Sequence, residues 1–166
     1  MGAIMSEQLH PLHTSLSLAQ AALILDECLA VRQKEDLLPL AVAVLDAGGQ
    51  LVAFKREDGC GVLRYDIAFG KAWAALGMGM STRLIRDRLA NRPAFQSALA
   101  SASDGRFIPV PGGVLILNEQ KSVIGAVGVS GDASDRDEHA ACEGIKAAGL
   151  ASHPDAAVEN WRDAAL

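Results

Sequence analysis

The chain is poor in aromatic residues, in cysteines and in positive charge. Aromatic side chains make up 4% of its 166 residues against 50% for apolar residues as a whole, so small aliphatic side chains must fill the core. Its three cysteines, Cys28, Cys60 and Cys142, have neither the number nor the spacing of a disulfide framework or a zinc site. The net charge of −5 argues against a nucleic-acid or anionic-membrane partner, because both require a concentrated basic surface.

Signals for export and for membrane insertion are missing as well. Residues 1–14 carry no basic residue ahead of an apolar run, which differs from a secretory signal peptide. No apolar stretch approaches the roughly 20 residues that span a bilayer. We therefore expect a cytoplasmic protein with reduced thiols. Its single domain should cover residues 16–150, between a disordered leader, 1–15, and a loosely held tail, 151–166.

Hydrophobic periodicity predicts several helices. The first begins at Ser17, which has capping-box spacing to Gln20, and ends in the charged run 32–36. Its apolar positions at helical spacing are Leu18, Ala22, Leu25 and Leu29. The other helices are expected at 65–78, in two pieces within 81–102 that break at 91–93, and after residue 134.

Two β-hairpins separate these helices. The first joins strands 40–46 and 50–57 through a turn whose glycines tolerate positive φ, and the second joins 114–118 to 122–130. Hairpins pair strands antiparallel, unlike βαβ crossovers. The sequence therefore predicts an α/β domain with a largely antiparallel sheet and helices packed on it.

Two cations are candidate ligand-binding residues. Arg56 ends a strand near Asp58, and it either holds a carboxylate in its planar fork or is a solvated strand-end residue. Lys71 lies among Ala, Phe, Gly and Trp residues, where it either covers an apolar helix face with its stem or binds an anion and exchanges a proton. We predict that both cations flank one anionic pocket, walled by Gly112 and Gly113 and by the start of the last helix.

Glycines mark two places where another group can come close. Gly112 and Gly113 precede a strand and either form a plain turn or present N–H groups to an anion. Gly125, Gly128 and Gly131 recur within an apolar strand, at a spacing that differs from a dinucleotide-binding fingerprint. Because glycine weakens a strand, its repetition indicates close packing against a helix, a ligand or a neighbouring chain.

The last helix carries acidic residues, a histidine and a cysteine. Asp135, Asp137 and Glu138 fall in its first turn, where negative charge suits the helix dipole. His139 and Cys142 provide two potential metal ligands, whereas a structural site normally needs four, so we expect a solvated face and no metal. A histidine-ligated haem would have to use His139 or a histidine of the leader or tail.

Taken together, these motifs resemble the GlcG/HbpS-like family, also called the haem-degrading domain, which includes the C-terminal domain of PduO-type proteins. The matching stretches are AVAVLDAGGQLV at 41–52, Arg56 with Asp58-Gly59, Ile67-Ala68 with Lys71-Ala72, Pro111-Gly112-Gly113, IGAVGVSG at 124–131, and Asp137-Glu138 with Ala140. Their shared order runs from about Leu16 to Ala148, nearly the whole structured chain.

The resemblance implies a profilin-like three-layer α/β/α fold with a five-stranded, largely antiparallel sheet, and homo-oligomers such as hexamers or octamers. Some members bind haem or corrinoid-type cofactors, and others are encoded among enzymes of glycolate or aromatic degradation. The chain departs from the family at Trp73, where threonine is usual, and at 114–116, where Pro-Ile usually follows the glycine pair. Both changes make the expected pocket more apolar.

Three functions remain open from the sequence. The first is a small-molecule-binding protein that takes haem or a related tetrapyrrole. The second is a metal-independent catabolic enzyme that acts on a carboxylate-bearing intermediate by acid/base chemistry, with Lys71, Arg56 and Glu138 as catalytic residues. The third is a non-catalytic assembly or chaperone-like partner. The ligand-binding residues would be Arg64, Tyr65, Gly112, Gly113, Ser130 and Asp137.

Overall fold

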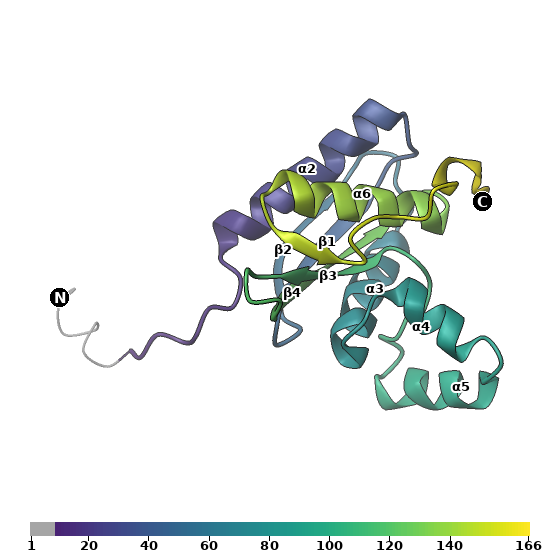
Figure 1. Cartoon of the computed structure of the whole chain (residues 1–166), viewed down its shortest axis with the longest axis horizontal. Coiled ribbons are helices and arrows are strands. Elements are labelled where there is room, and N and C mark those ends of the chain that lie inside the picture. The colour runs from purple at the N-terminus through teal and green to yellow at the C-terminus, as the bar shows by residue number, and fades with distance from the viewer. Residues whose placement is uncertain (1–8) are drawn as a thin grey trace.

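A five-stranded sheet forms the centre of the computed structural model, which describes residues 9–166 (Figure 1). The strands are β1 (Ala41–Asp46), β2 (Leu51–Arg56), β3 (Gly113–Leu117), β4 (Val123–Ser130) and β5 (Ala151–His153). Their order across the sheet is β2-β1-β4-β3-β5, and every neighbouring pair is antiparallel. The two predicted hairpins are confirmed as the pairs β1–β2 and β3–β4.

Helices cover both faces of the sheet and complete three layers. Helices α2 (Leu18–Glu35) and α6 (Ser134–Ala147) pack on one face, and α3 (Arg64–Met78) packs on the other (Figure 1). Helices α4 (Thr82–Leu89) and α5 (Pro93–Ala102) follow α3 and form an arm, here called the α4–α5 arm, that extends away from the sheet. The predicted α/β/α fold class is therefore confirmed. Among residues 9–166, no helix has the length and apolar character needed to cross a membrane.

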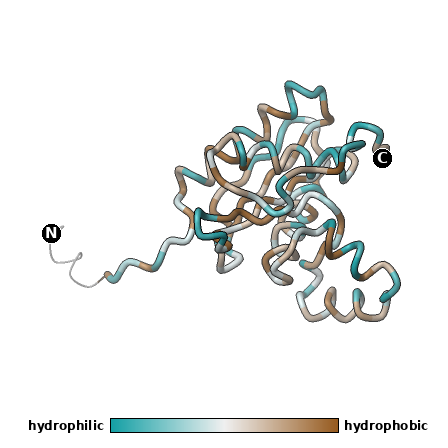
Figure 2. The backbone as a smooth tube through the Cα atoms, viewed as in Figure 1, coloured by the Kyte–Doolittle hydropathy of each residue, from teal (hydrophilic) through white to brown (hydrophobic). Residues whose placement is uncertain are grey.

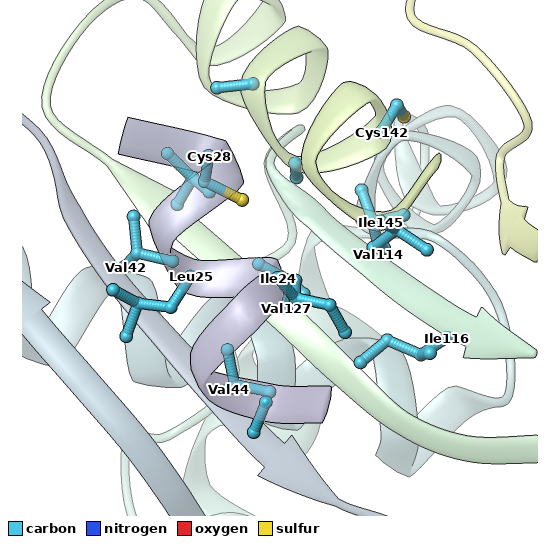
Figure 3. Close-up of a cluster of buried hydrophobic side chains, with 14 of the residues drawn as sticks. Ile24, Leu25, Cys28, Val42, Val44, Val114, Ile116, Val127, Cys142 and Ile145 are labelled. Carbon is cyan, nitrogen blue, oxygen red and sulfur yellow. The ribbon is translucent and has the colours of Figure 1, made fainter. Parts of the chain in front are cut away.

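The main core lies between the sheet and the helix pair α2 and α6 (Figure 3). Val42 and Val44 project from the same face of β1 towards Ile24 and Leu25 of α2, and Ile145 of α6 joins them; all five are buried. Figure 2 shows hydrophobic segments through the centre of the domain and hydrophilic ones at many of its outer turns. The strand alternation thus places one apolar face under α2 and α6 and leaves the other to α3.

The start of α2 agrees with its capping signal, but its buried face differs from the expected one. The Ser17 hydroxyl accepts a hydrogen bond from the Gln20 backbone N–H at 3.1 Å, and the Gln20 side chain accepts one from the Ser17 N–H at 3.0 Å. The buried residues are Ala21, Ile24, Leu25 and Cys28. Of the four expected positions only Leu25 is buried, because the other three lie in the exposed first turn or flank the stripe that meets the sheet.

The expected tail, 151–166, supplies a strand of the sheet. β5 pairs with β3 from Leu117↔Ala151 to Leu115↔His153, and a short 3₁₀ helix, η1 (Trp161–Asp163), returns to α6. A three-residue strand is too short to show an alternating pattern in the sequence. At the other end, residues 9–14 form neither helix nor strand, and positions 1–8 of the expected leader lie outside the described residues.

Candidate functional site

Lys71 forms a buried ion pair where α3 meets β4 and α6. Its ammonium Nζ donates to Asp137 Oδ2 and to the Val129 carbonyl oxygen, each at 2.9 Å. Asp137 Oδ1 accepts from the Asp132 backbone N–H at 3.0 Å. Burial raises the pKa of Asp137 to about 6, although the Lys71 ammonium opposes the rise. The Lys71 side chain is only 2% exposed, so the pair ties α3 to the sheet and to α6 and leaves the ammonium closed to solvent.

The glycine pair before β3 makes room for this ion pair. Gly112 has a φ of 118°, and a Cβ there would lie 2.9 Å from Lys71 Nζ. The Gly113 N–H donates to Thr82 Oγ1 at 2.8 Å, and a Cβ on Gly113 would collide with the Lys71 carbonyl oxygen. The Gly113 N–H, one of the groups predicted to face an anion, is therefore hydrogen-bonded to Thr82, the first residue of α4.

Arg64 and Ser130 lie at the same end of the sheet as the ion pair. Arg64 Nη1 donates to Ser130 Oγ at 3.2 Å, and the guanidinium acts to lower the pKa of Asp137. Tyr65 stands further out, 36% exposed, with its ring edge-on to Phe54 at 4.8 Å between centroids. The structure thus brings Arg64, Ser130 and Asp137 together and leaves Tyr65 in an aromatic contact at the surface.

Glu138 is fully buried beneath α4 with an incomplete set of partners. Arg83 Nε lies 3.1 Å from Glu138 Oε1, yet neither carboxylate oxygen accepts a hydrogen bond from any of residues 9–166. The same guanidinium donates through Nη2 to the Ala156 carbonyl oxygen at 3.0 Å. Burial raises the pKa of Glu138 to about 7 against the lowering effect of Arg83. The pKa of the Glu138 carboxyl therefore lies close to neutral pH, although the side chain has no exposed surface.

Arg56 lies apart from these buried groups. It lines an open depression of about 430 Å³ together with Arg32, Pro39, Glu57 and Asp58. Arg56 ends the edge strand β2, whereas Lys71 contacts β4, which is two strands away in the sheet order. The structure does not bring Arg56 and Lys71 to one anionic pocket, because the lysine turns inward to Asp137.

An apolar cavity of about 190 Å³ lies between α3 and the α4–α5 arm. It is lined by Trp73, Gly77, Met78, Leu99, Ala102, Ser103 and Phe107. None of the residues of α5 is buried, so the side of the cavity that α5 forms is accessible to solvent. No sequence motif predicts this cavity. Its residue Trp73, however, is one of the two departures from the family pattern, and the sequence predicts that it makes a pocket more apolar. The other departure, 114–116, is buried in β3 instead.

A guanidinium and a thioether accompany the apolar walls. The Arg106 guanidinium lies 4.5 Å from the centroid of the Trp73 ring, a cation–π distance. Met78 is one of the lining residues, and methionine is known to hold haem iron in some proteins. A second depression of about 170 Å³ shares Trp73 and Gly77 with the cavity and extends to the turn 47–49.

The histidine and cysteine of α6 are engaged elsewhere. His139 stacks on Trp161 with 3.7 Å between ring centroids, and burial lowers the pKa of the imidazole. Cys142, expected on a solvated face, is buried, because the C-terminal segment covers it and the Pro154 carbonyl oxygen accepts from its thiol at 3.5 Å. Within residues 9–166, no three His, Cys, Asp or Glu side chains are grouped to hold a metal ion.

Comparison with known proteins identifies a family for most of the chain. The model of the family described as haem degrading protein HbpS-like matches residues 16–146. A 15.0 kDa protein encoded between dhaT and dhaS in Citrobacter freundii is 32% identical over 100 residues, which cover 60% of this chain and 69% of that protein.

Solved structures share the fold. The Klebsiella pneumoniae protein ORFY superposes with a TM-score of 0.71 at 27% identity, over 84% of this chain and 94% of that one. A double mutant of Streptomyces reticuli HbpS gives 0.69 at 26% identity, over 84% and 90%. A complex of PduOC with haem gives 0.74 at 24% identity, over 83% and 98%, which supports the fold alone.

Proposed function

The chain belongs to the HbpS-like family of haem-degrading proteins, and on this premise we propose that it binds haem or a related tetrapyrrole at the apolar cavity beside Trp73. The observation that carries the proposal is one accessible apolar cavity whose lining residues include Trp73 and Met78. Small-molecule sites are mostly apolar concavities with a few placed polar groups. Haem would bring redox-active iron and two propionate groups to such a site.

The size of the cavity defines how such a ligand would sit. Pockets that enclose a whole drug-sized ligand have about 300–1,000 Å³, so a cavity of about 190 Å³ receives one edge of a macrocycle. The second depression, about 170 Å³, is lined by the same two residues, Trp73 and Gly77. A flat ring system would therefore reach from one hollow towards the other past Trp73, with apolar and aromatic contacts to the lining.

The iron ligand in this proposal is Met78. Met78 is one of the residues that line the cavity. No histidine is among them: His139 is stacked on Trp161, His153 belongs to β5, and His10 and His13 precede α2. Coordination by two histidines is therefore not expected. Met78 is the residue of the lining that would hold the iron of a bound haem.

The alternative of a catabolic enzyme has weaker geometric support. Its proposed residues Lys71 and Glu138 are both closed to solvent, and Arg56 lines a separate depression. A general acid or base must reach the proton that it transfers.

Titration with hemin, followed through the Soret absorbance, tests the proposal. We expect saturable binding to the wild-type chain and a spectrum without a six-coordinate bis-histidine signature. Met78→Leu should shift the Soret band, because it removes the sulfur and keeps the volume. Trp73→Ala should weaken binding by about tenfold through the loss of stacking and apolar contact.

His139→Ala is the matched control, since it removes an imidazole that lies outside the cavity. The variant should bind hemin with the wild-type spectrum, and thermal melts should show that all three variants are folded. A wild-type chain without saturable binding contradicts the proposal. A low-spin spectrum that disappears in His139→Ala and persists in Met78→Leu would move the site to α6.

A further inference from the structure

We infer that Arg106 makes this cavity selective for a flat aromatic ligand that carries a carboxylate. The inference rests on the proposed function and names the group that would recognise the acidic side chains of the ligand. Arg106 directly precedes Phe107 of the cavity lining and stacks on Trp73 of the same lining, which places it at the rim.

The backbone around Arg106 is held on both sides. The Arg106 N–H donates to the Ser103 carbonyl oxygen at 3.1 Å, and the Phe107 N–H donates to Ser103 Oγ at the same distance. The Ile108 N–H donates to the Gly70 carbonyl oxygen of α3 at 3.4 Å. A Cβ on Gly70 would lie 2.9 Å from the Arg106 carbonyl oxygen, so this glycine lets the segment approach α3 closely. The residue is thus anchored before any ligand arrives.

The side chain of Arg106 is oriented but electrostatically unpaired. Its Nε donates to the Ser103 carbonyl oxygen at 2.8 Å, which fixes the guanidinium against the indole. Within residues 9–166 it has no carboxylate partner and no hydrogen bond from its two terminal nitrogens. By contrast, Arg162 stacks on Trp161 in a similar way but is paired with Glu35 at 2.6 Å.

This arrangement matches the chemistry of a carboxylate on a planar ring. The two free terminal nitrogens provide the parallel donors that a carboxylate accepts. The apolar walls next to the guanidinium, which include Trp73 and Phe107, provide the contact surface for the ring. Because the Nε bond and the backbone contacts already restrict the side chain, little conformational entropy is lost when the carboxylate binds.

Affinities of hemin and hemin dimethyl ester, measured by absorbance titration in one buffer, test the inference. The two ligands share a macrocycle and an iron and differ in the charge of the propionates. The wild-type chain should bind hemin about tenfold more tightly than the ester. Arg106→Met keeps an unbranched apolar stem on the indole, and it should lose this tenfold preference while binding the ester as the wild type does.

Arg92→Met is the matched control. Arg92 lies in the α4–α5 arm and, like Arg106, stacks on an aromatic ring, here Phe95 at 4.5 Å, but Phe95 is outside the cavity lining. This variant should keep the tenfold preference for hemin. Equal affinities for hemin and ester in the wild type, or the same loss in both variants, would overturn the role of Arg106 and leave the proposed function standing. No saturable binding of either ligand would overturn the proposed function and the inference with it.

Discussion

At the scale of single residues, the Glu138 carboxyl carries the clearest energetic cost. It has no exposed surface, and Arg83 is its single close counter-charge within residues 9–166, while Asp135 of the same helix adds repulsion. The pKa of Glu138 rises from 4.5 to about 7 in the folded chain. The folded state therefore binds this proton more tightly than the unfolded state does. The contribution of Glu138 to the free energy of unfolding therefore falls as the pH rises from 4.5 to about 7, and it is constant above about pH 7.

Glu138→Gln should therefore stabilise the protein at alkaline pH, by up to about 3 kcal/mol, since a neutral amide replaces a buried charge of the same shape. The gain should shrink as the pH falls towards 4.5 and disappear below it, where Glu138 is protonated in both states. Urea denaturation of both chains at about pH 5 and about pH 8 measures the difference. A variant that is less stable than the wild type at about pH 8 would show that the Arg83 pair outweighs the cost of burial.

Lys71→Met should destabilise the fold by about 3–5 kcal/mol, because it leaves the Asp137 carboxylate buried without its cation. Lys71→Met combined with Asp137→Leu should recover most of this loss, since no buried charge remains. Thermal and urea unfolding of the three chains measure both effects. If Lys71→Met kept the wild-type melting temperature but did not bind hemin, Lys71 would instead belong to the ligand-binding site.

The sequence identified several residues of the buried polar cluster but misjudged what they face. Lys71 stands out because it interrupts an apolar stretch, whereas Asp137 and Glu138 stand out as acidic residues in the first turn of the last helix. Sequence spacing does not reveal that Asp137, rather than a ligand, accepts from Lys71, since the two are 66 positions apart. The sequence does not predict the cavity at Trp73 for a related reason. Its walls come from α3 and from the end of α5, and apolar residues in either helix are typical of ordinary core packing.

At the scale of elements, the packing of α3 on the sheet depends on a glycine. Gly128 of β4 pairs with Ala43 of β1 and Gly113 of β3, and a Cβ there would collide with the Ala68 carbonyl oxygen of α3. The close packing expected from the repeated glycines is thus provided at Gly128 by a helix backbone. Element positions were predictable because hydrophobic period and turn glycines are local signals. β5 was not, because its pairing with β3 is long-range.

Gly128→Ala should cost at least about 3 kcal/mol, since the helix must move away from the sheet to admit a methyl group. Gly61→Ala is the control, because the nearest atom to a Cβ there is Arg64 Cγ at 3.9 Å, an ordinary contact. Chemical denaturation should separate the two variants clearly. Equal stability of Gly128→Ala and the wild type would contradict the packing of α3 on β4 described above.

At the scale of the whole molecule, exposed apolar surface predicts self-association. Val62 and Leu63 are 82% and 62% exposed in the segment before α3, and Phe95 of α5 is 37% exposed. Symmetric homo-oligomers commonly bury such surfaces. Light scattering at micromolar concentration should therefore give a mass that is a multiple of 17.3 kDa. A mass of one chain under these conditions would contradict this expectation.

The location of bound iron tests the central claim most directly. Crystals grown with hemin can be measured at the iron absorption edge, and the anomalous difference map then marks the metal without reference to a fitted ligand. We expect one strong peak beside the Met78 sulfur, with the macrocycle across Trp73 and its propionates towards Arg106. A peak beside His139 or in the Arg56 depression, or no peak in crystals of a chain saturated with hemin, would contradict a haem site at this cavity.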